Sequence, residues 1–440
     1  MSIRVFVACL FFLVVSVPTV GYSETLTLEE AVQIALSNHQ RIRQAEELYS
    51  ASSASANAAA SDRLPSLDLA FSYDHLYDKP YQSIGGHPLS TSDEDRFHYQ
   101  ITLTQPLFTG FSLSARKKLA ELDVDMARYD IQQARRKLAL DVHIAALRLL
   151  QIQALQHLAK QQCTQLESHL HDVQAAFDQG MVPGNDRLKA EVALASAQQH
   201  LRTITSRVKL TRSSLNLLLR RPQQNSLTIV EPQTIQKPPL SLQQLTETAL
   251  QQRPEVATAR TAITAIGEKK NLVKSKNYPH VALVASYWRD GDNLSASHNT
   301  YSNEDNAAIG IHLDWNLFSG GADHARLAAV QHQQRAKRQA LLELEDMIRL
   351  QIEDAFDQLD VAASNEKTAA KALEQARENH RLSVLQFHEN LISTSDLLAA
   401  QTLLTRAEAD LKTAHYGSLL AMAQLSYALG QDPLPETEVN

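Results

Sequence analysis

The sequence changes its hydrophobic period abruptly at one point, and this change limits the folds that the chain can adopt. Between Phe97 and Thr104 the apolar residues occupy the odd positions, which is the pattern of a half-buried strand. After Pro106 and Gly110, the stretch from Phe111 to Gln179 contains no proline or glycine, and its apolar residues recur at helical spacing. An unbroken helix of that length would extend on the order of 100 Å. A strand must therefore lead into a helix far taller than an ordinary globular domain.

The same arrangement occurs twice in the chain. The junction Leu107–Gly110 is repeated as Leu317–Gly320, 210 positions later (107 to 317). Nearer the start, Leu26–Glu30 is matched by Leu240–Gln244 at an offset of 214 (26 to 240). Matched residues in the same order over most of the chain indicate an internal duplication. We predict a first structural repeat over 24–230, a second over 231–432 and a C-terminal tail over 433–440.

Residues 1–23 have the character of a secretory signal peptide. One positive charge, Arg4, precedes the apolar run Val5–Val17, and Pro18 follows with small and polar residues. Such a segment is too short for a mature membrane-spanning helix and is removed on export. Removal would change the formal charge from −7 to −8, and no basic run suggests binding to nucleic acid. Cys163 would then be the only cysteine, and we expect a reduced thiol buried between helices.

Each repeat contains two alternating segments of about ten residues, long enough to cross a bilayer at a tilt. The predicted strands cover 67–77 and 97–105, then 281–287 and 307–315, with loops over 78–96 and 291–305. The change of offset falls between Tyr73 and Leu107, in the first of these loops. Aromatic residues lie near both ends of the strands, as membrane interfaces require. The residues expected to face lipid are Leu69, Phe71, Ile101, Leu103, Ile309 and Ile311.

Four strands cannot close a barrel by themselves. The alternation alone would suit a soluble antiparallel sheet equally well. However, strands that lead into long helices would leave both edges of such a sheet open, and a membrane does not tolerate open edges. Several chains that pool their strands into one closed barrel would satisfy both conditions.

Long helices are predicted on the other side of the strands. Residues 28–62 form one predicted helix, with Thr27 as N-cap and Glu30 at the capping-box spacing. Two helical hairpins follow the strands, 111–179 with 187–220 and 322–389 with 397–429. Their apolar stripes are typical of antiparallel coiled-coil packing. No run after the signal peptide reaches 18 apolar residues, so we expect no membrane-spanning helix.

At the junctions and hairpin tips, the residues resemble the TolC family of outer-membrane efflux and secretion channels. The resemblance extends over the mature chain and is carried by Gln105–Gly110, Trp315–Gly320, Ala249–Val256 and the tip pattern Phe177–Asp186. It implies a mainly α fold with a transmembrane β part, in which a homotrimer shares a 12-stranded β-barrel in outer-membrane lipid. The long helices would form a coiled-coil barrel across the periplasm. Their tips would dock onto a periplasmic adaptor (membrane fusion protein) of an inner-membrane transporter.

Two acids are candidates for the pore constriction. Asp186 and Asp396 occupy equivalent positions at the starts of the returning helices, and the resemblance implies an acidic ring at the periplasmic mouth. Three like charges near one axis would attract cations. An acid in the first turn of a helix also stabilises the helix dipole. We favour the helix-start interpretation for Asp186 and the pore for Asp396.

The chain departs from the family's best-known member at this mouth. A second acid one turn after the first is replaced by Ala399. The tyrosine and arginine that close the mouth of that protein align with Phe387 and Ile392, which cannot form the same polar bonds. The sequence therefore does not indicate how the closed mouth is held.

The remaining predicted sites lie at the tips and the junctions. Residues expected to contact the adaptor are Gly180, Met181, Val182 and Pro183 in the first tip and Asn390, Leu391 and Ile392 in the second. The predicted strand–helix junction residues are Pro106, Gly110, Gly320 and Gly321. Exposed apolar residues at a hairpin tip indicate a partner surface, although ordinary turn residues would give the same pattern.

No cofactor, metal or catalytic site is indicated. The 17 histidines, including His169 and His171, are not grouped with cysteine or carboxylates at metal-ligand spacing, and no nucleophile motif occurs. We interpret the chain as a passive outer-membrane channel of a tripartite efflux pump or type I secretion system, for small-molecule or protein cargo. The alternative is a soluble periplasmic coiled-coil adaptor, which would bury Phe71 and Ile309 in a protein core. An enzyme is disfavoured.

Overall fold

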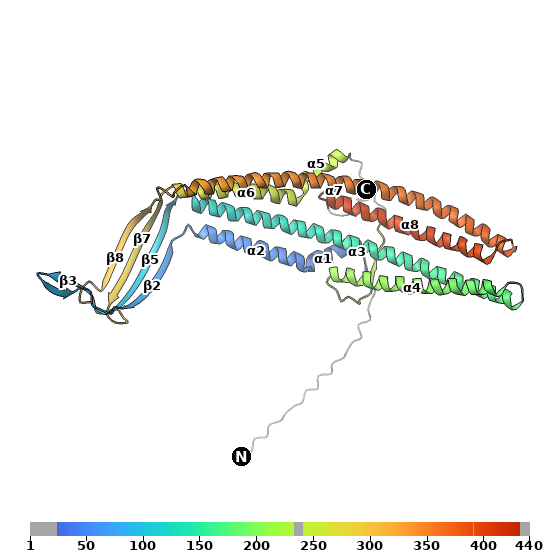
Figure 1. The fold of residues 1–440 in the computed structure, drawn as a ribbon, viewed down its shortest axis with the longest axis horizontal. Coiled ribbons are helices and arrows are strands. Elements are labelled where there is room, and N and C mark those ends of the chain that lie inside the picture. The colour runs from blue at the N-terminus through green and yellow to red at the C-terminus, as the bar shows by residue number, and fades with distance from the viewer. Residues whose placement is uncertain (1–23, 233–240, 390, 432–440) are drawn as a thin grey trace, which may run out of the picture.

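The computed structural model describes residues 24–232, 241–389 and 391–431, as one long, narrow molecule with its strands at one end (Figure 1). The predicted signal peptide, the C-terminal tail and Asn390 lie outside the described residues. The predicted division into a helical part and a β part is confirmed.

Four strands form one antiparallel sheet in the order β2-β5-β7-β8. Their bounds are Ser66–His75 (β2), Asp95–Thr109 (β5), His280–Gly291 (β7) and Asp305–Asp314 (β8). The central pair, β5 and β7, joins the first repeat to the second, with Ile101 opposite Tyr287. Within the described chain, β2 and β8 each pair on one side only, so both edges of this sheet are open.

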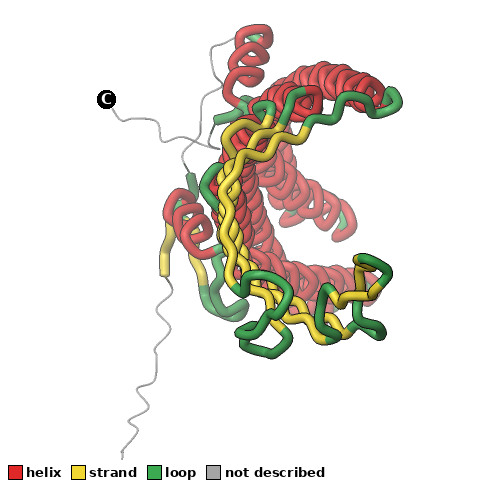
Figure 2. Tube along the Cα trace, turned by 90° about the vertical axis from the view of Figure 1, so that its left-hand side faces the viewer, coloured by secondary structure: helices red, strands yellow, loops and turns green. Residues whose placement is uncertain are grey.

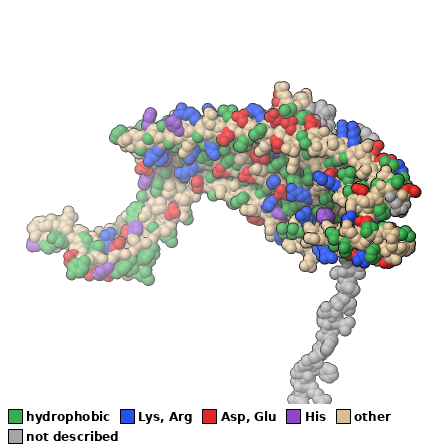
Figure 3. Space-filling model, turned by 45° about the vertical axis from the view of Figure 1, so that its right-hand side comes forward, with side chains coloured by type: hydrophobic (Ala, Val, Ile, Leu, Met, Phe, Trp, Pro, Cys, Tyr) green, Lys and Arg blue, Asp and Glu red, His purple; other side chains and the backbone are tan. Residues whose placement is uncertain are grey.

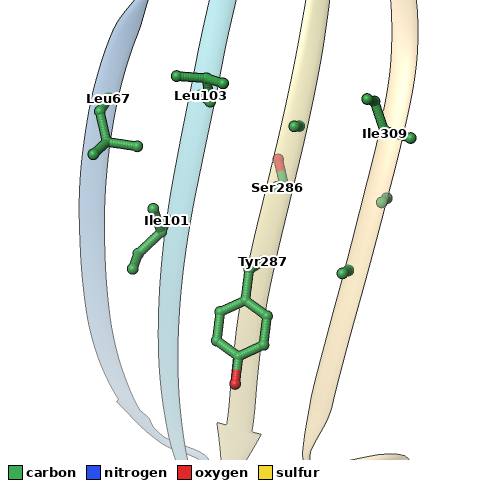
Figure 4. Close-up of a pocket in the computed structure, with 9 residues that line it drawn as sticks. Leu67, Ile101, Leu103, Ser286, Tyr287 and Ile309 are labelled. Carbon is green, nitrogen blue, oxygen red and sulfur yellow. The ribbon is translucent and has the colours of Figure 1, made fainter.

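The sheet has one apolar face. The six residues expected to face lipid are all exposed, and Figure 4 shows members of this face from all four strands: Leu67, Ile101, Leu103, Tyr287 and Ile309. In β5, Ile101 and Leu103 are exposed, whereas Thr102 and Thr104, which alternate with them, are partly covered. Charged side chains are sparser on this arm than on the helices (Figure 3).

The predicted loop over 78–96 contains structure that the sequence reading missed. Two short strands, Tyr81–Ile84 (β3) and His87–Ser90 (β4), pair as a hairpin. Gly85 and Gly86 link them with φ of 62° and 83°, as a two-residue hairpin turn requires. The prediction of a plain loop over 78–96 was therefore wrong for residues 81–90, because the Gly-Gly pair was interpreted only as a breaker.

The helices of the two repeats have matching lengths. In the first repeat they are Leu28–Asn38 (α1), Gln40–Ser61 (α2), Ser112–Asp178 (α3) and Gly184–Leu218 (α4). In the second they are Leu242–Gln252 (α5), Pro254–Lys274 (α6), Ala322–His388 (α7) and Thr394–Ala428 (α8), with a 3-10 turn over Ser275–Asn277 (η1). Both α3 and α7 have 67 residues, and both α4 and α8 have 35. The internal duplication is confirmed.

The predicted single helix over 28–62 is instead two helices. The break is at His39, whose extended backbone ends α1 and whose imidazole Nδ1 accepts the Arg41 backbone N–H at 3.1 Å. The residue is therefore the N-cap of α2, a role that the sequence reading did not assign. The predicted capping box of Thr27 and Glu30 is confirmed.

The main core lies midway along the helices. It is built from buried residues of both repeats, with Leu138, Val142 and Leu149 of α3 matched by Ile348, Ile352 and Leu359 of α7. Strand β1 (Glu24–Leu26) pairs in parallel with β6 (Leu227–Ile229) beside this core. One 18-residue window of α3 is apolar enough to span a membrane by composition, contrary to the sequence expectation, but half of it is buried inside the protein. That burial is typical of a core helix.

Seen along its length, the chain forms an open arc (Figure 2). The strands and the helices behind them follow the same curve and leave one side open. Helices α4 and α7 lie on opposite sides of the helical part (Figure 1).

Candidate functional site

The first helical tip is a tight turn that exposes one apolar side chain. After α3 ends, Gly180 adopts φ of 74°, and the Met181 N–H donates to the Ala176 carbonyl at 2.9 Å. This is a glycine-terminated helix end. Pro183 then precedes α4 in an extended conformation. The side chain of Met181 is 70% exposed at the end of the hairpin.

The second tip repeats this geometry with different residues. The N–H of Leu391 donates to the Gln386 carbonyl at 2.8 Å, as that of Met181 does in the first tip. Leu391, the equivalent of Met181 (181 to 391), is 73% exposed. Ile392 and Val182 are both partly covered. Each hairpin therefore exposes a large apolar side chain at an equivalent place in its tip.

Both candidate pore acids lie in the first turns of helices. The carboxylate of Asp396 accepts hydrogen bonds from the Ser393 hydroxyl at 2.7 Å and the Ser393 backbone N–H at 3.0 Å, in a capping box. These bonds hold the pKa of Asp396 below its usual range. Asp186 instead accepts a bond from Lys189 Nζ at 3.0 Å and is mostly covered. Asp396 is exposed.

Sequence reasoning missed the lysine that serves both acids. Lys189 forms an ion pair with Asp186, and its charge also lowers the pKa of Asp396. Lys189 of α4 therefore pairs with the acid of its own tip and lies close enough to act on the acid of the other. The spacing of three residues between Asp186 and Lys189, a neighbouring pair on a helix surface, was the signal that could have identified it.

The two tip hairpins contact each other through an aromatic pair and an amide–amide hydrogen bond. The imidazole of His169 meets the ring of Phe387 with centroids 5.8 Å apart. Nearby, Gln401 Nε2 donates to Gln165 Oε1 at 2.6 Å. The position aligned with a tyrosine in the family's best-known member therefore makes an aromatic contact here, and Ala399 is exposed.

Burial of Cys163 is as predicted. The thiol lies in a small cluster with Leu166 and Ala197, between α3 and α4, and burial raises its pKa. Among the described residues, no three His, Cys, Asp or Glu side chains lie close enough to hold a metal ion.

The four junction residues have different structural roles. Pro106 lies at a register shift between β5 and β7. Gly110 has φ of 59° and packs so tightly that a Cβ would overlap the Ser275 carbonyl oxygen. Gly320 and Gly321 also have positive φ, 62° and 84°, but face open space.

Comparison with known proteins identifies one family. A sequence model described as "Outer membrane efflux protein" matches residues 31–219 and 245–431, one segment in each repeat. The outer membrane efflux protein BepC of Brucella suis is 23% identical over 334 residues, which are 74% of this chain and 72% of BepC. The alkaline protease secretion protein AprF of Pseudomonas aeruginosa is 26% identical over 351 residues, 77% of this chain and 70% of AprF.

Solved structures share the fold. The outer membrane protein VceC of Vibrio cholerae superposes with a TM-score of 0.77 over 92% of this chain and 96% of VceC, at 19% identity. The CmeC outer membrane channel of Campylobacter jejuni gives a TM-score of 0.78 over 92% of this chain and 85% of CmeC, at 13% identity.

Proposed function

The chain belongs to the outer membrane efflux protein family, and from that premise we propose that it is the trimeric exit duct of a tripartite pump or type I secretion system. As a member of the family it is an outer-membrane channel that extends into the periplasm. Its relatives are channel proteins rather than enzymes, and family members work with periplasmic adaptors and inner-membrane transporters.

The observation that carries the proposal is the sheet. Its exposed apolar face matches what lipid requires of a transmembrane barrel, and its two open edges match what further copies would pair with. The curvature of the strands in Figure 2 supports closure into a barrel. Three chains with four strands each give twelve strands, a barrel wide enough to leave a lumen.

We propose that the helical tips are the docking surface. Met181 and Leu391 protrude at equivalent places, so three chains would present six apolar residues around the mouth. An adaptor with complementary apolar pockets would bury them. Next to this ring, three copies of Asp396 would form the acidic constriction, with Asp186 held back by Lys189.

The names of the relatives indicate two classes of cargo. One relative is named for efflux and the other for secretion of an alkaline protease. We propose that the duct carries small molecules or an exported protein, selected by the transporter that docks to it and not by this chain.

Arginine placed on the apolar face tests the membrane assignment. Ile309→Arg should cost about 2–4 kcal/mol if the residue lies near the bilayer midplane, and outer-membrane trimers should be lost. His312→Arg is the matched control, because it lies on the same strand and the opposite face. The measurement is the amount of heat-resistant trimer in membrane extracts. Equal trimer yields for both variants would contradict a lipid-facing position for Ile309.

A further inference from the structure

A cavity of about 230 Å³ lies where β5 leads into α3, at the end of the sheet next to the helices (Figure 1). Its polar lining comes from Arg63, Thr109 and Ser114, and its apolar lining includes Phe108 and Leu113. Arg63 lies between α2 and β2. The cavity is therefore formed within the first repeat, between the end of one helix and the start of another.

The second repeat contains an equivalent cavity. It has a volume of about 330 Å³ and lies where the chain passes from β8 into α7. All eight residues that line the first cavity have their repeat equivalents in the lining of the second: Arg63 corresponds to Asn277 (63 to 277), and Ser114 to His324 (114 to 324). The cavity is therefore a feature of the duplicated fold.

The two cavities differ in charge. The position of Leu113 in the first cavity is occupied by Asp323 in the second, whose lining also includes Lys274. The second cavity thus holds one charge of each sign. No carboxylate lines the first cavity, and its one charged lining residue is Arg63. The first cavity is therefore the one that suits an anion.

The guanidinium of Arg63 has a neutral partner. It donates from Nη2 to the hydroxyl of Ser114 at 2.9 Å, and no carboxylate among the described residues forms an ion pair with it. The backbone carbonyl of Arg63 accepts a hydrogen bond from Gln105 Nε2 at 2.9 Å, which holds the chain at this point. A guanidinium binds phosphate oxygens through paired N–H donors. The exposed Arg63 therefore has both the charge and the donors for a phosphate group.

The cavity continues the apolar face of the sheet. A register shift just before Phe108 places this residue opposite Val281 of β7. Val281 lies on the same side of β7 as Ala285, which belongs to the apolar face, because residues four apart in a strand share a side. Leu107 and Phe111 of the cavity lining are 56% and 61% exposed. The cavity is therefore next to the face assigned to lipid.

Segments of the same chain flank this junction on both sides. Strand β5 is paired with β2 on one side and with β7 on the other. The ring of Phe108 also meets the ring of Tyr278, which follows η1, with centroids 6.5 Å apart. A further copy would pair at the open edges, β2 and β8, beyond these flanking segments. The opening of the cavity is therefore left to the lipid.

We propose that this cavity binds the headgroup of an anionic phospholipid, with the phosphodiester on Arg63 and the acyl chains along Leu107 and the apolar face. The proposal rests on the proposed function, which places this face in lipid. Under that function the helices extend into the periplasm, so the lipid belongs to the periplasmic leaflet of the outer membrane. The exposed ring of Phe111 suits this depth, because aromatic side chains gather at membrane interfaces. Bound lipid would hold the channel at a fixed height in the bilayer.

Removal of the charge at Arg63 tests the site. The detergent-solubilised protein is titrated with phosphatidylglycerol, and native mass spectrometry measures the number of lipids retained per chain. Arg63→Gln should weaken phosphatidylglycerol binding about tenfold, because a charge-assisted contact with the phosphodiester is lost. Arg63→Lys keeps the charge without the paired donors and should lose less. Unchanged binding in Arg63→Gln would overturn the proposal.

A neighbouring arginine is the matched control. Arg116 lies two residues after Ser114 on α3, is exposed and does not line the cavity. Arg116→Gln should therefore leave phosphatidylglycerol binding nearly unchanged. Equal losses in Arg63→Gln and Arg116→Gln would show a general attraction of lipid to basic residues and would contradict a site in the cavity.

A larger side chain gives an independent measurement. Ser114→Phe keeps the charge of Arg63 and places a ring in the cavity, so most of the retained phosphatidylglycerol should be lost. Ser114 is exposed, and trimer yield in membrane extracts checks that the variant assembles. Undiminished binding would place the lipid outside the cavity.

The failure of this site is distinguishable from the failure of the proposed function. If Arg63→Gln binds phosphatidylglycerol as the wild type does while Ile309→Arg still loses its trimers, the lipid site alone is wrong. If Ile309→Arg and His312→Arg give equal trimer yields, the membrane assignment falls, and the lipid site falls with it.

Discussion

The turns that precede α3 and α7 have the same backbone and different residues. Before α3, Gly110 and Phe111 both have positive φ, 59° and 70°. Before α7, the equivalent residues Gly320 and Gly321 have φ of 62° and 84°. A phenylalanine in this conformation is strained. In the first repeat its ring packs edge-on against Phe108 and Tyr278, with centroids 5.5 and 6.0 Å away, which offsets part of the strain.

The break between the short and the long N-terminal helices also differs between the repeats. In the second repeat the buried Arg253 donates from Nε to the Ala428 carbonyl at 2.6 Å and from Nη1 to Gln351 Oε1 at 2.8 Å. The equivalent of Arg253 is His39 (253 to 39), which caps α2 instead. The two repeats therefore share their backbone geometry, but side chains at equivalent positions form hydrogen bonds with different partners.

Alanine at the two junction glycines should give the largest difference between the repeats. Gly110→Ala adds a Cβ that overlaps the Ser275 carbonyl oxygen and approaches Tyr278 Cβ to 2.8 Å. We expect a loss of about 3 kcal/mol or more from overpacking and backbone strain together. Gly320→Ala meets open space, so only backbone strain of about 1–2 kcal/mol remains. Unfolding in denaturant measures the loss of unfolding free energy in both variants. Equal losses would contradict the proposed difference in packing around the two glycines.

Removing Arg253 should be the next largest effect. Arg253→Met leaves the carbonyl of the buried Ala428 without its donor, at a cost of about 1–3 kcal/mol, whereas the exposed Gln351 can bond to water instead. His39→Ala removes only a helix cap, at about 1 kcal/mol. Thermal unfolding of the detergent-solubilised protein would rank the two. A larger loss for His39→Ala than for Arg253→Met would show that the helix break contributes more to stability in the first repeat than in the second.

The acids at the tips should differ in function more than in stability. Asp396→Ala should reduce cation preference and weaken block by multivalent cations, because the exposed carboxylate is the one proposed for the pore. Asp186→Ala is the equivalent variant and should change selectivity less, since Lys189 already neutralises that carboxylate. The measurement is reversal potential in planar bilayers. Unchanged selectivity in both variants would leave Asp396 only its capping of α8.

The smallest effect concerns pH. Burial lowers the pKa of His169, and the equivalent residue in α7 is the exposed Asn379. Since the folded pKa lies below the unfolded value near 6.5, the unfolded state binds protons first. Stability is therefore full above about 6.5 and falls as the pH drops toward the folded pKa. His169→Gln should reduce the fall in unfolding temperature between pH 7.5 and 5.5, and an unchanged fall would show that His169 contributes nothing.

The period of the apolar residues predicted the long strands and helices, because the buried side of each of these elements is defined by that period. The strands around Ile101 and Ile309 and the helices α3 and α7 follow from patterns of period 2 and 3.6. The duplication then predicted matching lengths in the two repeats. The break at His39 was missed, because a single residue that caps a following helix leaves the apolar spacing unchanged.

The tip chemistry was only partly predictable. Ser393 lies three residues before Asp396, which is the spacing of a capping box, so the hydrogen bonds of Asp396 could have been foreseen. The contact of His169 with Phe387 could not, because 218 residues separate them in sequence (169 to 387) and only packing of the two hairpins brings them together.

The equal lengths of α3 and α7 limit how such a chain can change over time. An insertion of one heptad in α3 would raise its tip by about 10 Å, and α4 would need the same insertion to keep the hairpin in register. The second hairpin would then need the same insertions in α7 and α8, because otherwise the two tips would end at different heights. Selection should therefore eliminate single insertions in the helices, whereas the loops between the strands can change in length. The offset between the repeats changes there, from 214 between the starts of β2 and β7 (66 to 280) to 210 between those of β5 and β8 (95 to 305).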